Sequence, residues 1–389
     1  MRTYEKTHPW ITFAFDENKL DSKTWMLLGQ TQAKCEHISM APLMPSLSEE
    51  LHRVYLAKGV HATTAIEGNS LSEEQVREKV DGRLELPPSK EYLGKEVGNI
   101  IDACNEIANQ TFEGQVTGLA IEDICHFNAM VLNGLEDLVE GVPGKLRAPG
   151  HEVRVANYRG APPEDLGYLL NRMCERLNRG FAPPQENLRI AYGILRAIFA
   201  HLYLAWIHPF GDGNGRTARL LELRILLEAG VPKPAAQLLS NHYNDTRADY
   251  YRHLRLSSNQ TEGHYSFFTY ALQGFVDGLN EQIHRIEEQQ FVVHWINAVE
   301  NAFLNERASS TTNRRKRLIL DMMTLGRPVP VRDIRNVSEW MRISYENKTQ
   351  KTVMRDLNRL GDMNLIRATT DGYIPNFEIV LARLPRVLQ

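Results

Sequence analysis

The sequence predicts a mainly α-helical fold with two short β-hairpins, and three observations carry that prediction. Apolar residues recur at helical spacing through most of residues 46–306. The alternation typical of strands is confined to short stretches near residues 153–155 and 364–375. Two long apolar segments flank I-H-P-F-G-D-G-N-G-R-T-A-R, residues 207–219, which has the composition of a tight loop that opens onto a helix.

Length and composition narrow the class of protein. A chain of 389 residues is long enough for two or three domains with their own cores. No apolar run is expected to reach membrane-spanning length, and the first ten residues lack a signal-peptide pattern, so we expect a cytoplasmic protein without membrane contact. The cysteines lie far apart without a C-x-x-C, which predicts reduced, mostly buried thiols rather than disulfides or a zinc site. They are Cys35, Cys104, Cys125 and Cys174.

Residues 1–110 are expected to form an N-terminal region whose main element is a helix at about 50–68. Its helical spacing stops at Gly68-Asn69, which is a typical C-terminal stop. Further helices are expected at 91–109 and 118–133. The stretch 141–157 combines turn residues at 148–150 with alternation at Val153 and Val155, and therefore predicts a β-hairpin.

A core domain is expected over residues 111–282. Residues 186–206 are apolar on nearly every side, as in a buried helix, and their His201 is expected to be a core histidine rather than a ligand. A second buried helix is expected at 217–229, followed by helices at about 244–258, 263–281 and 283–306. A connecting helix and linker would then fill residues 283–310, and A-S-S-T-T-N at 308–313 reads as the linker itself.

The C-terminal region, residues 311–389, has the element order of a winged helix-turn-helix. Helices are expected at 314–324 and about 347–361, and two strands around Asp371-Gly372. Basic residues outnumber acidic ones here, whereas the rest of the chain is acidic. Lys348, Lys351 and Arg355 on the candidate recognition helix suggest DNA contact, but a solvated basic surface, protein docking or dimerisation stay open.

The loop at 207–219 combines residue types suited to binding a nucleoside triphosphate. Glycines at a helix start let backbone N–H groups approach an anion, and the helix dipole favours negative charge. Arg216 and Arg219 share one helix face and can fork onto phosphate oxygens. Asp212 offers a hard oxygen for Mg²⁺, and the pKa range of His208 suits a general base. No P-loop motif is present in the sequence.

Residues 208–219 match H-P-F-x-[D/E]-G-N-[G/K]-R-x-x-R without a mismatch, and over roughly 45–280 the chain resembles the Fic domain family. The resemblance implies a Fic-type helical bundle with a β-hairpin flap, here followed by the winged-helix domain. It also implies an enzyme that transfers AMP from ATP to a Ser, Thr or Tyr hydroxyl of target proteins or of itself, releasing pyrophosphate. Removal of AMP by the same site, a nucleotide-sensing DNA-binding regulator and a homodimer stay open.

The resemblance also assigns roles to single residues. His208 would be the base, Phe210 would anchor the loop in the core, Asp212 would hold Mg²⁺, and Arg219 would hold the γ-phosphate. Gly rather than Lys at position 215 favours AMP transfer over phosphorylation. Tyr250 and Tyr251 would line the base pocket, with a core role as the alternative; Ser258 stands where the family often has Asn, with Asn259 next to it. The ATP-binding set is Gly211, Asp212, Gly213, Asn214, Gly215, Arg216, Arg219, Tyr250 and Tyr251.

Two further segments complete the resemblance. Thr63–Gly68 matches the inhibitory pattern [S/T]-x-x-x-E-[G/N], so Thr63, Glu67 and Gly68 would form a brake built into the same chain. A Glu67 carboxylate paired with Arg219 would occupy the guanidinium that the γ-phosphate needs. The predicted hairpin would be a flap whose exposed edge pairs with an extended target segment. Its residues are Val153, Arg154, Val155 and Ala156.

Overall fold

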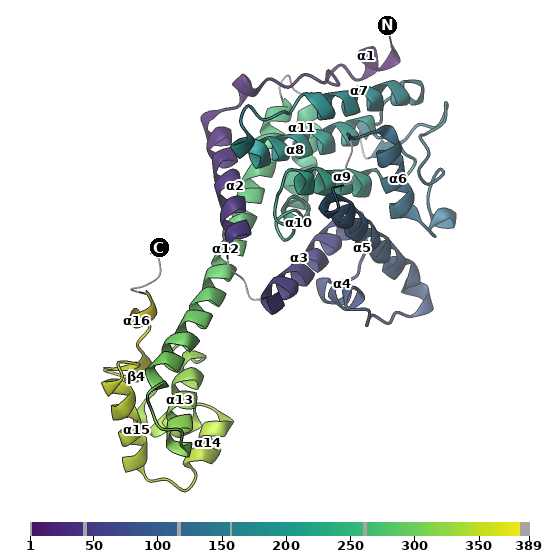
Figure 1. Ribbon diagram of the computed structural model, residues 1–389. Coiled ribbons are helices and arrows are strands. Elements are labelled where there is room, and N and C mark those ends of the chain that lie inside the picture. The colour runs from purple at the N-terminus through teal and green to yellow at the C-terminus, as the bar shows by residue number, and fades with distance from the viewer. Residues whose placement is uncertain (1, 42–44, 115–117, 156–157, 260–262, 382–389) are drawn as a thin grey trace. The chain divides into compact units, whose positions relative to one another are not determined.

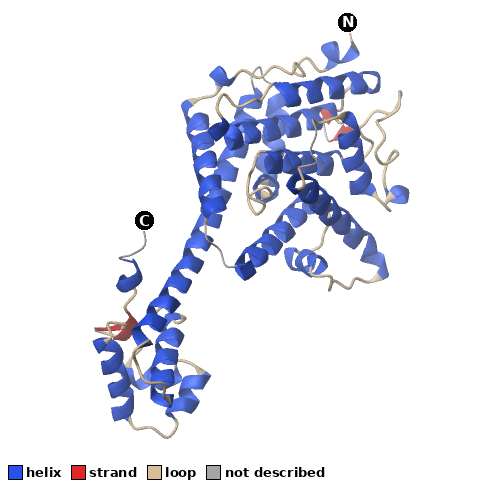
Figure 2. Ribbon diagram, viewed as in Figure 1, coloured by secondary structure: helices blue, strands red, loops and turns tan. Residues whose placement is uncertain are grey.

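The computed structural model describes residues 2–41, 45–114, 118–155, 158–259 and 263–381, and these are mainly helical, as Figure 2 shows. The chain divides into two compact units, residues 1–283 and 284–389. The boundary falls inside one long helix, α12 (Gly263–Phe303). The expected break between helices at 281–283 is therefore wrong, and the sequence there, Glu281-Gln282-Ile283, contains no helix-breaking residue.

Two antiparallel neighbours, α8 (Arg189–Ile207) and α9 (Asn214–Glu228), form the centre of unit 1 (Figure 1). Helices α2 (Ser22–Met40) and α7 (Leu166–Arg179) pack on α8, and α5 (Glu91–Phe112) and α6 (Ile121–Leu132) pack on α9. Nearly every side chain of α8 is buried, which confirms the predicted buried helix. By length and composition alone residues 186–207 could cross a membrane, contrary to our expectation, but 89% of the apolar 18-residue window within this stretch is buried inside the protein.

The N-terminal region places one helix end near the start of α9. Helix α3 (Pro45–Ala65) packs against α10 (Leu238–Asp245), α4 (Glu73–Val80) and α5. Ser72 caps α4 through a capping box with Gln75. The helix expected at 244–258 is instead divided between α10 and α11 (Arg247–Asn259), since Thr246 leaves the helical conformation between them. Asp and Thr compete with helix hydrogen bonds and favour such ends.

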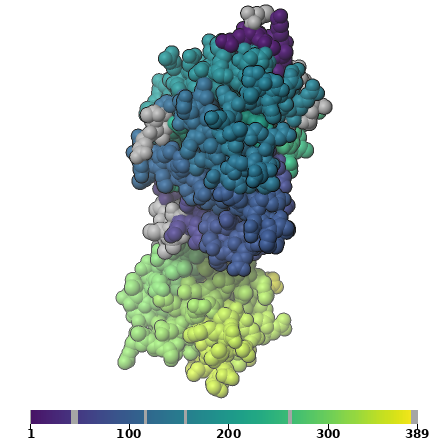
Figure 3. Space-filling view, turned by 90° about the vertical axis from the view of Figure 1, so that its right-hand side faces the viewer, coloured from purple at the N-terminus to yellow at the C-terminus, as the bar shows by residue number. Residues whose placement is uncertain are grey.

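Short elements complete unit 1. The N-terminal arm lies on the surface beside α7, where Arg2 pairs with Asp165 at 3.2 Å; in Figure 3 it is the purple strip next to teal residues. The short helices are α1 (Thr3–Thr7), η1 (Glu17–Lys19), η2 (Pro88–Lys90), η3 (Glu136–Leu138), η4 (Pro163–Asp165) and η5 (Glu186–Leu188). The cysteines are free, and Cys35, Cys104 and Cys174 are buried, as predicted.

The hairpin lies further along the chain than predicted. Strands β1 (Arg154–Val155) and β2 (Tyr158–Arg159) pair antiparallel, with Arg154 opposite Arg159 and Val155 opposite Tyr158. The turn residues at 148–150 do form a turn, in which His151 N–H donates to the Ala148 carbonyl at 3.0 Å, but this turn precedes the strands. Val153 therefore lies outside the strands, and Ala156 lies outside the described residues.

Unit 2 combines helices with a second hairpin. Its helices are α13 (Ser310–Met323), η6 (Val331–Asn336), α14 (Glu339–Tyr345), α15 (Gln350–Asp362) and α16 (Glu378–Leu381). The predicted strands around Asp371-Gly372 are present as β3 (Ile366–Thr369) and β4 (Gly372–Pro375), and Val329 bridges to Tyr373. Helix α14 was not predicted, and α13 begins inside the stretch read as a linker because Ser309 caps it.

A buried carboxylate ties the helices of unit 2 together. Asp356 of α15 accepts hydrogen bonds from Arg314 Nε at 2.8 Å, Arg315 Nε at 2.7 Å and the Tyr345 hydroxyl at 2.9 Å. Because three donors satisfy this one buried charge, the group fixes how α13, α14 and α15 meet. Apolar side chains around it form the core: Leu318, Ile319, Met322, Ile334, Met341, Val353, Leu357 and Leu360.

Candidate functional site

The loop between α8 and α9 is closed by its own residues. His208 ends α8 in the left-handed conformation, with φ 49° and ψ 61°, and Gly213 begins α9 with φ 76°. The Asn214 side chain accepts from Phe210 N–H and donates to the Phe210 carbonyl, each at 2.9 Å. The Phe210 ring is buried. These two hydrogen bonds close the loop, and they occupy the side-chain amide of Asn214.

Asn128 of α6, which was not among the predicted site residues, supports the loop from the α6 side. Its amide nitrogen donates to the Asp212 carbonyl at 2.9 Å and to the Thr217 hydroxyl at 3.3 Å. Its oxygen accepts from Gly144 N–H at 2.9 Å, and the residue is fully buried. A signal for it exists in the sequence, because Asn128 is a lone amide within the apolar helix pattern F-N-A-M-V-L.

Arg147 holds the other side of the loop. Its Nε donates to the His208 carbonyl at 2.8 Å, and its backbone N–H donates to the Pro209 carbonyl at 2.9 Å. Its remaining guanidinium nitrogens bind the carbonyls of His151 and Ala161. Nothing in the local sequence marks Arg147 for this position, since its partners come from separate segments of the chain.

His208 is held as a neutral imidazole. Burial and the nearby Arg147 charge lower the pKa of His208 from 6.5 to about 4. The ring also hydrogen-bonds to the Ala205 carbonyl, so one nitrogen is the donor and the other keeps its lone pair. At neutral pH the side chain can therefore accept a proton from a group placed beside it.

Arg216 and Arg219 of α9 each carry buried N–H groups without a partner among the described residues. Arg216 binds Asp212 Oδ1 at 3.1 Å and Glu96 Oε1 at 3.4 Å, yet its Nε bonds to nothing. Arg219 donates through one terminal nitrogen to the Thr63 carbonyl at 2.9 Å and to Glu67 Oε1 at 2.6 Å, while its Nε and other terminal nitrogen stay unpaired. Buried donors of this kind at a helix N-terminus favour an anion such as phosphate.

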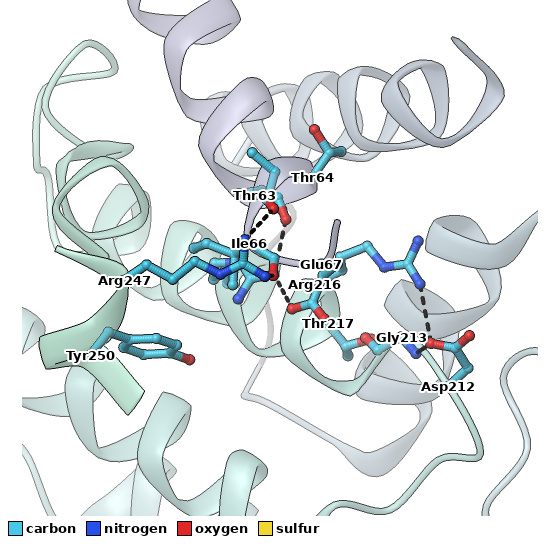
Figure 4. Close-up of polar contacts among 12 residues, drawn as sticks. Thr63, Thr64, Ile66, Glu67, Asp212, Gly213, Arg216, Thr217, Arg247 and Tyr250 are labelled. Atoms are coloured by element: carbon cyan, nitrogen blue, oxygen red, sulfur yellow. Dashed lines mark hydrogen bonds and ion pairs between the residues drawn. The ribbon is translucent and has the colours of Figure 1, made fainter. Parts of the chain in front are cut away.

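Glu67 lies in the turn that follows α3, not in the helix itself, and Gly68 continues the turn with φ 99°. Its carboxylate is about one-third exposed (34%) and faces the start of α9 (Figure 4). Burial alone would raise the pKa of Glu67, but the Arg219 charge and hydrogen bond outweigh it and lower the pKa. Thr63 takes part through its carbonyl rather than its hydroxyl.

Gly215 lets the Glu67 carboxylate approach α9 closely. A Cβ at this position would collide with Glu67 Oε1. Of the sequence-predicted residues, Glu67, Thr63, Gly215, Arg216 and Arg219 are therefore brought together. Gly211 lies on the opposite side of the loop, where a Cβ would collide with the Glu140 carbonyl.

Asp212 is the residue that could hold Mg²⁺. Its side chain is 40% exposed, and its Oδ1 accepts from Gly213 N–H and from Arg216. The described residues contain no group of three or more His, Cys, Asp or Glu side chains arranged for a metal. One exposed carboxylate fits Mg²⁺ that arrives with nucleotide phosphates, because Mg²⁺ keeps few protein ligands in such sites.

The two tyrosines expected at the base pocket lie in different environments. Tyr250 is buried, and its hydroxyl bonds to His201 Nε2 at 2.9 Å. His201 is fully buried and its Nδ1 lies 3.0 Å from Glu222 Oε2, so it is a core histidine, as predicted. Tyr251 is 42% exposed, with its hydroxyl 3.4 Å from the Ile66 carbonyl. Ser258 bonds to its own helix, at the Arg255 carbonyl, and the Asn259 side chain lies outside the described residues.

The hairpin lies beside His208. The Tyr158 hydroxyl donates to the Trp206 carbonyl at 2.7 Å, and Ala161 N–H donates to the Ile207 carbonyl at 3.1 Å. A Cβ on Gly160 would crowd the Cβ of His208. The end of β2 and the residues after it therefore lie beside His208, and β1, which pairs with β2, carries the exposed Arg154.

Comparison with known proteins agrees with this geometry. Residues 118–226 match the family model described as Fic/DOC family. The chain is 29% identical over 244 residues to protein adenylyltransferase fic-1 of Caenorhabditis briggsae and 29% identical over 200 residues to protein adenylyltransferase Fic of Nematostella vectensis. These matches cover 61% and 51% of this chain and 43% of each relative, so the chain spans less than half the length of these curated relatives.

Solved structures resemble the fold. A Fic family protein from Desulfovibrio desulfuricans superposes with a TM-score of 0.55 at 19% identity, covering 94% of this chain and 95% of that one. Fic-1 from Caenorhabditis elegans gives a TM-score of 0.53 at 25% identity, covering 68% of this chain and 73% of that one. Because the first of these structures covers 94% of this chain, the mainly helical fold class is supported outside residues 118–226 as well.

Proposed function

We propose that this chain, which contains a Fic/DOC family domain, transfers AMP from ATP to a hydroxyl side chain of a target protein or of itself and releases pyrophosphate. The observation that carries the proposal is the pair of buried guanidiniums, Arg216 and Arg219, with unpaired N–H groups beside a neutral His208. That combination supplies both a phosphate site and a base. The names of the relatives, protein adenylyltransferases, support the same reaction.

The proposed step is an in-line displacement at the α-phosphorus of ATP. The target hydroxyl oxygen forms a bond to phosphorus, the bond to the bridging oxygen of pyrophosphate breaks, and the hydroxyl proton moves to the free nitrogen of His208. Arg216, Arg219 and the first N–H groups of α9 neutralise the phosphate charge. Mg²⁺ held by Asp212 and the phosphates would add to that neutralisation.

The target is proposed to dock at the hairpin. Because a free strand edge can pair with an extended segment, β1 could place a target hydroxyl next to His208. The proximity of Gly160 to His208 supports this position.

Glu67 is proposed to restrain the reaction. Its carboxylate occupies a terminal nitrogen of Arg219, at 2.6 Å, which a phosphate group of ATP would otherwise bind. Transfer then requires the turn at 66–68 to withdraw. The exposed position of the carboxylate supports a contact that can be exchanged for a ligand.

Two labels of ATP test the reaction. The Glu67→Gly variant should incorporate label from α-³²P ATP into protein and none from γ-³²P ATP, whereas a phosphoryl transferase gives the opposite pattern. His208→Ala in the same background is the control and should remove the signal. If the α-label is incorporated neither into the protein itself nor into the proteins of an added cell extract, AMP transfer is refuted.

A second function is proposed for unit 2 because of one exposed face. Lys351, Arg355 and Asn358 recur at helical spacing along α15 and are all exposed; Lys348 precedes them. Among the described residues none of these lysines or Arg355 forms an ion pair. We propose a winged-helix domain that contacts DNA with this face. Fluorescence anisotropy with duplex DNA should show binding that weakens steeply with salt, and salt-independent or absent binding contradicts it.

A further inference from the structure

The turn that carries Glu67 is held at a second place, away from the phosphate loop. Arg247, the first residue of α11, donates through its two terminal nitrogens to the Ile66 carbonyl at 2.6 Å and to the Ala65 carbonyl at 3.3 Å. Figure 4 shows Arg247 reaching toward Ile66. The Tyr251 hydroxyl, 3.4 Å from the same Ile66 carbonyl, adds a third contact from the next turn of α11.

These contacts suit the chemistry of a helix end. The Ala65 and Ile66 carbonyls lie at the C-terminal end of α3, which carries partial negative charge, so a guanidinium placed there is favourable. The Arg247 guanidinium also lies 5.9 Å from the centre of the Tyr251 ring, which orients it toward the turn. The Ile66 side chain is fully buried, so the turn has an apolar anchor as well.

The two arginines that hold the turn differ in what else they do. Arg219 is buried, and in the proposed reaction it must also bind phosphate. Arg247 is exposed, lies outside the phosphate loop, and among the described residues its guanidinium donates to the Ala65 and Ile66 carbonyls. Its contacts can therefore strengthen or weaken the turn without altering the phosphate site.

We propose that Arg247, assisted by Tyr251, is a positioning residue of the brake that keeps Glu67 on Arg219 from outside the phosphate loop. The proposal rests on the proposed function and adds a regulatory anchor to it. Any group that draws Arg247 away from the two carbonyls would loosen the turn without competing with ATP for Arg219. An acidic side chain or a phosphate group on a partner has the charge to do so.

The test compares AMP incorporation by Arg247→Ala with that of the unaltered chain. Loss of the charged donor should raise incorporation about 3- to 10-fold, less than in Glu67→Gly, because the exposed contact is partly replaced by water. In the Glu67→Gly background the same change should add nothing. Arg252→Ala is the matched control, since Arg252 lies on the same helix and pairs with Asp249 at 2.8 Å. It should leave incorporation unchanged.

Two outcomes overturn the anchor while leaving the proposed function intact. One is an Arg247→Ala rate equal to that of the unaltered chain while Glu67→Gly is active. The other is an Arg247→Ala increase that persists in the Glu67→Gly background, because the residue would then act on catalysis rather than on the brake.

Hydrogen exchange tests whether Arg247 anchors the turn even if no AMP transfer is detected. Glu67 N–H bonds to the Thr64 carbonyl at 3.1 Å, and Gly68 N–H bonds to the Ala65 carbonyl at 2.9 Å. Exchange of these two amides should be faster in Arg247→Ala than in the unaltered chain and in Arg252→Ala. Equal exchange in all three refutes the anchor, whereas an inactive Glu67→Gly variant refutes only the proposed function.

Discussion

The phosphate loop and the inhibitory turn meet at Arg219, yet they are held in opposite ways. The loop is held by buried groups from three segments of the chain, Asn128, Arg147 and Asn214, and most of their bonds go to backbone carbonyls and N–H groups. The turn is held by a one-third exposed carboxylate, Glu67, and by the exposed Arg247.

This difference separates a permanent structure from a removable one. Breaking a buried hydrogen bond leaves a group without a partner, which costs about 1–3 kcal/mol, whereas water can replace an exposed contact. The contacts of the exposed Arg247 accordingly contribute only about 0–1 kcal/mol, whereas the charge-assisted bond from the buried Arg219 to Glu67 contributes about 1.5–3 kcal/mol. The loop should therefore keep its shape whether or not a nucleotide is bound, while the turn can leave.

The largest effect is expected on the loop side, from removing the base. In the Glu67→Gly background, His208→Ala should lower AMP incorporation by roughly 10²- to 10⁴-fold, the usual contribution of a general base. ATP binding should change little, because no phosphate contact is removed. A loss of less than tenfold would mean that another group takes the proton.

Removing a support of the loop should come next. Asn128→Ala leaves the Asp212 carbonyl and Gly144 N–H without their partner, so the free energy of unfolding should fall by about 1–3 kcal/mol and transfer should fall with it. Asn99→Ala is the matched control, since Asn99 is also buried but bonds to the carbonyls of Val131 and Asn133. Chemical denaturation should show a similar loss of unfolding free energy for both variants, whereas AMP transfer should fall only for Asn128→Ala. Equal transfer losses would contradict a specific support.

A graded change should follow on the turn side. Glu67→Gln keeps the shape of the side chain but removes its charge, so the bond to Arg219 weakens without vanishing. Transfer should rise several-fold, to a rate between those of the unaltered chain and Glu67→Gly. Initial rates of label incorporation check the order, and a Gln variant as active as Gly would show that only the charge matters.

The smallest effect is expected from pH. Because the pKa of His208 is lowered to about 4, the Glu67→Gly variant should lose little activity between pH 8 and about 5, whereas an ordinary histidine would titrate near 6.5. The unfolded chain takes up this proton first, so stability should fall as pH drops from 6.5 toward 4. A rate profile that falls through pH 6.5 would contradict a buried, neutral base.

The parts of the site that are contiguous in the sequence could be predicted, and the parts assembled from distant segments could not. Residues 208–219 form one unbroken motif, and Glu67 carries its own short pattern, so both could be identified before the structure. Arg147 and Arg247 reach the site only through the packing of distant segments, and both bind backbone carbonyls, which leave no mark in the sequence. Asn128 is marked only as a lone amide within an apolar helix pattern. The hairpin was placed too early because turn residues occur both before it and within it, and only pairing decides the register.

AMP incorporation by the Glu67→Gly variant relative to the unaltered chain tests most directly whether Arg219 is shared between a nucleotide and the inhibitory turn. The contact that the variant removes is charge-assisted, and such contacts contribute about 1.5–3 kcal/mol, so the rate should rise roughly 10- to 100-fold at the same ATP concentration. His208→Ala in the same background should bring incorporation back to the level without protein. Equal rates for Glu67→Gly and the unaltered chain would contradict the shared guanidinium.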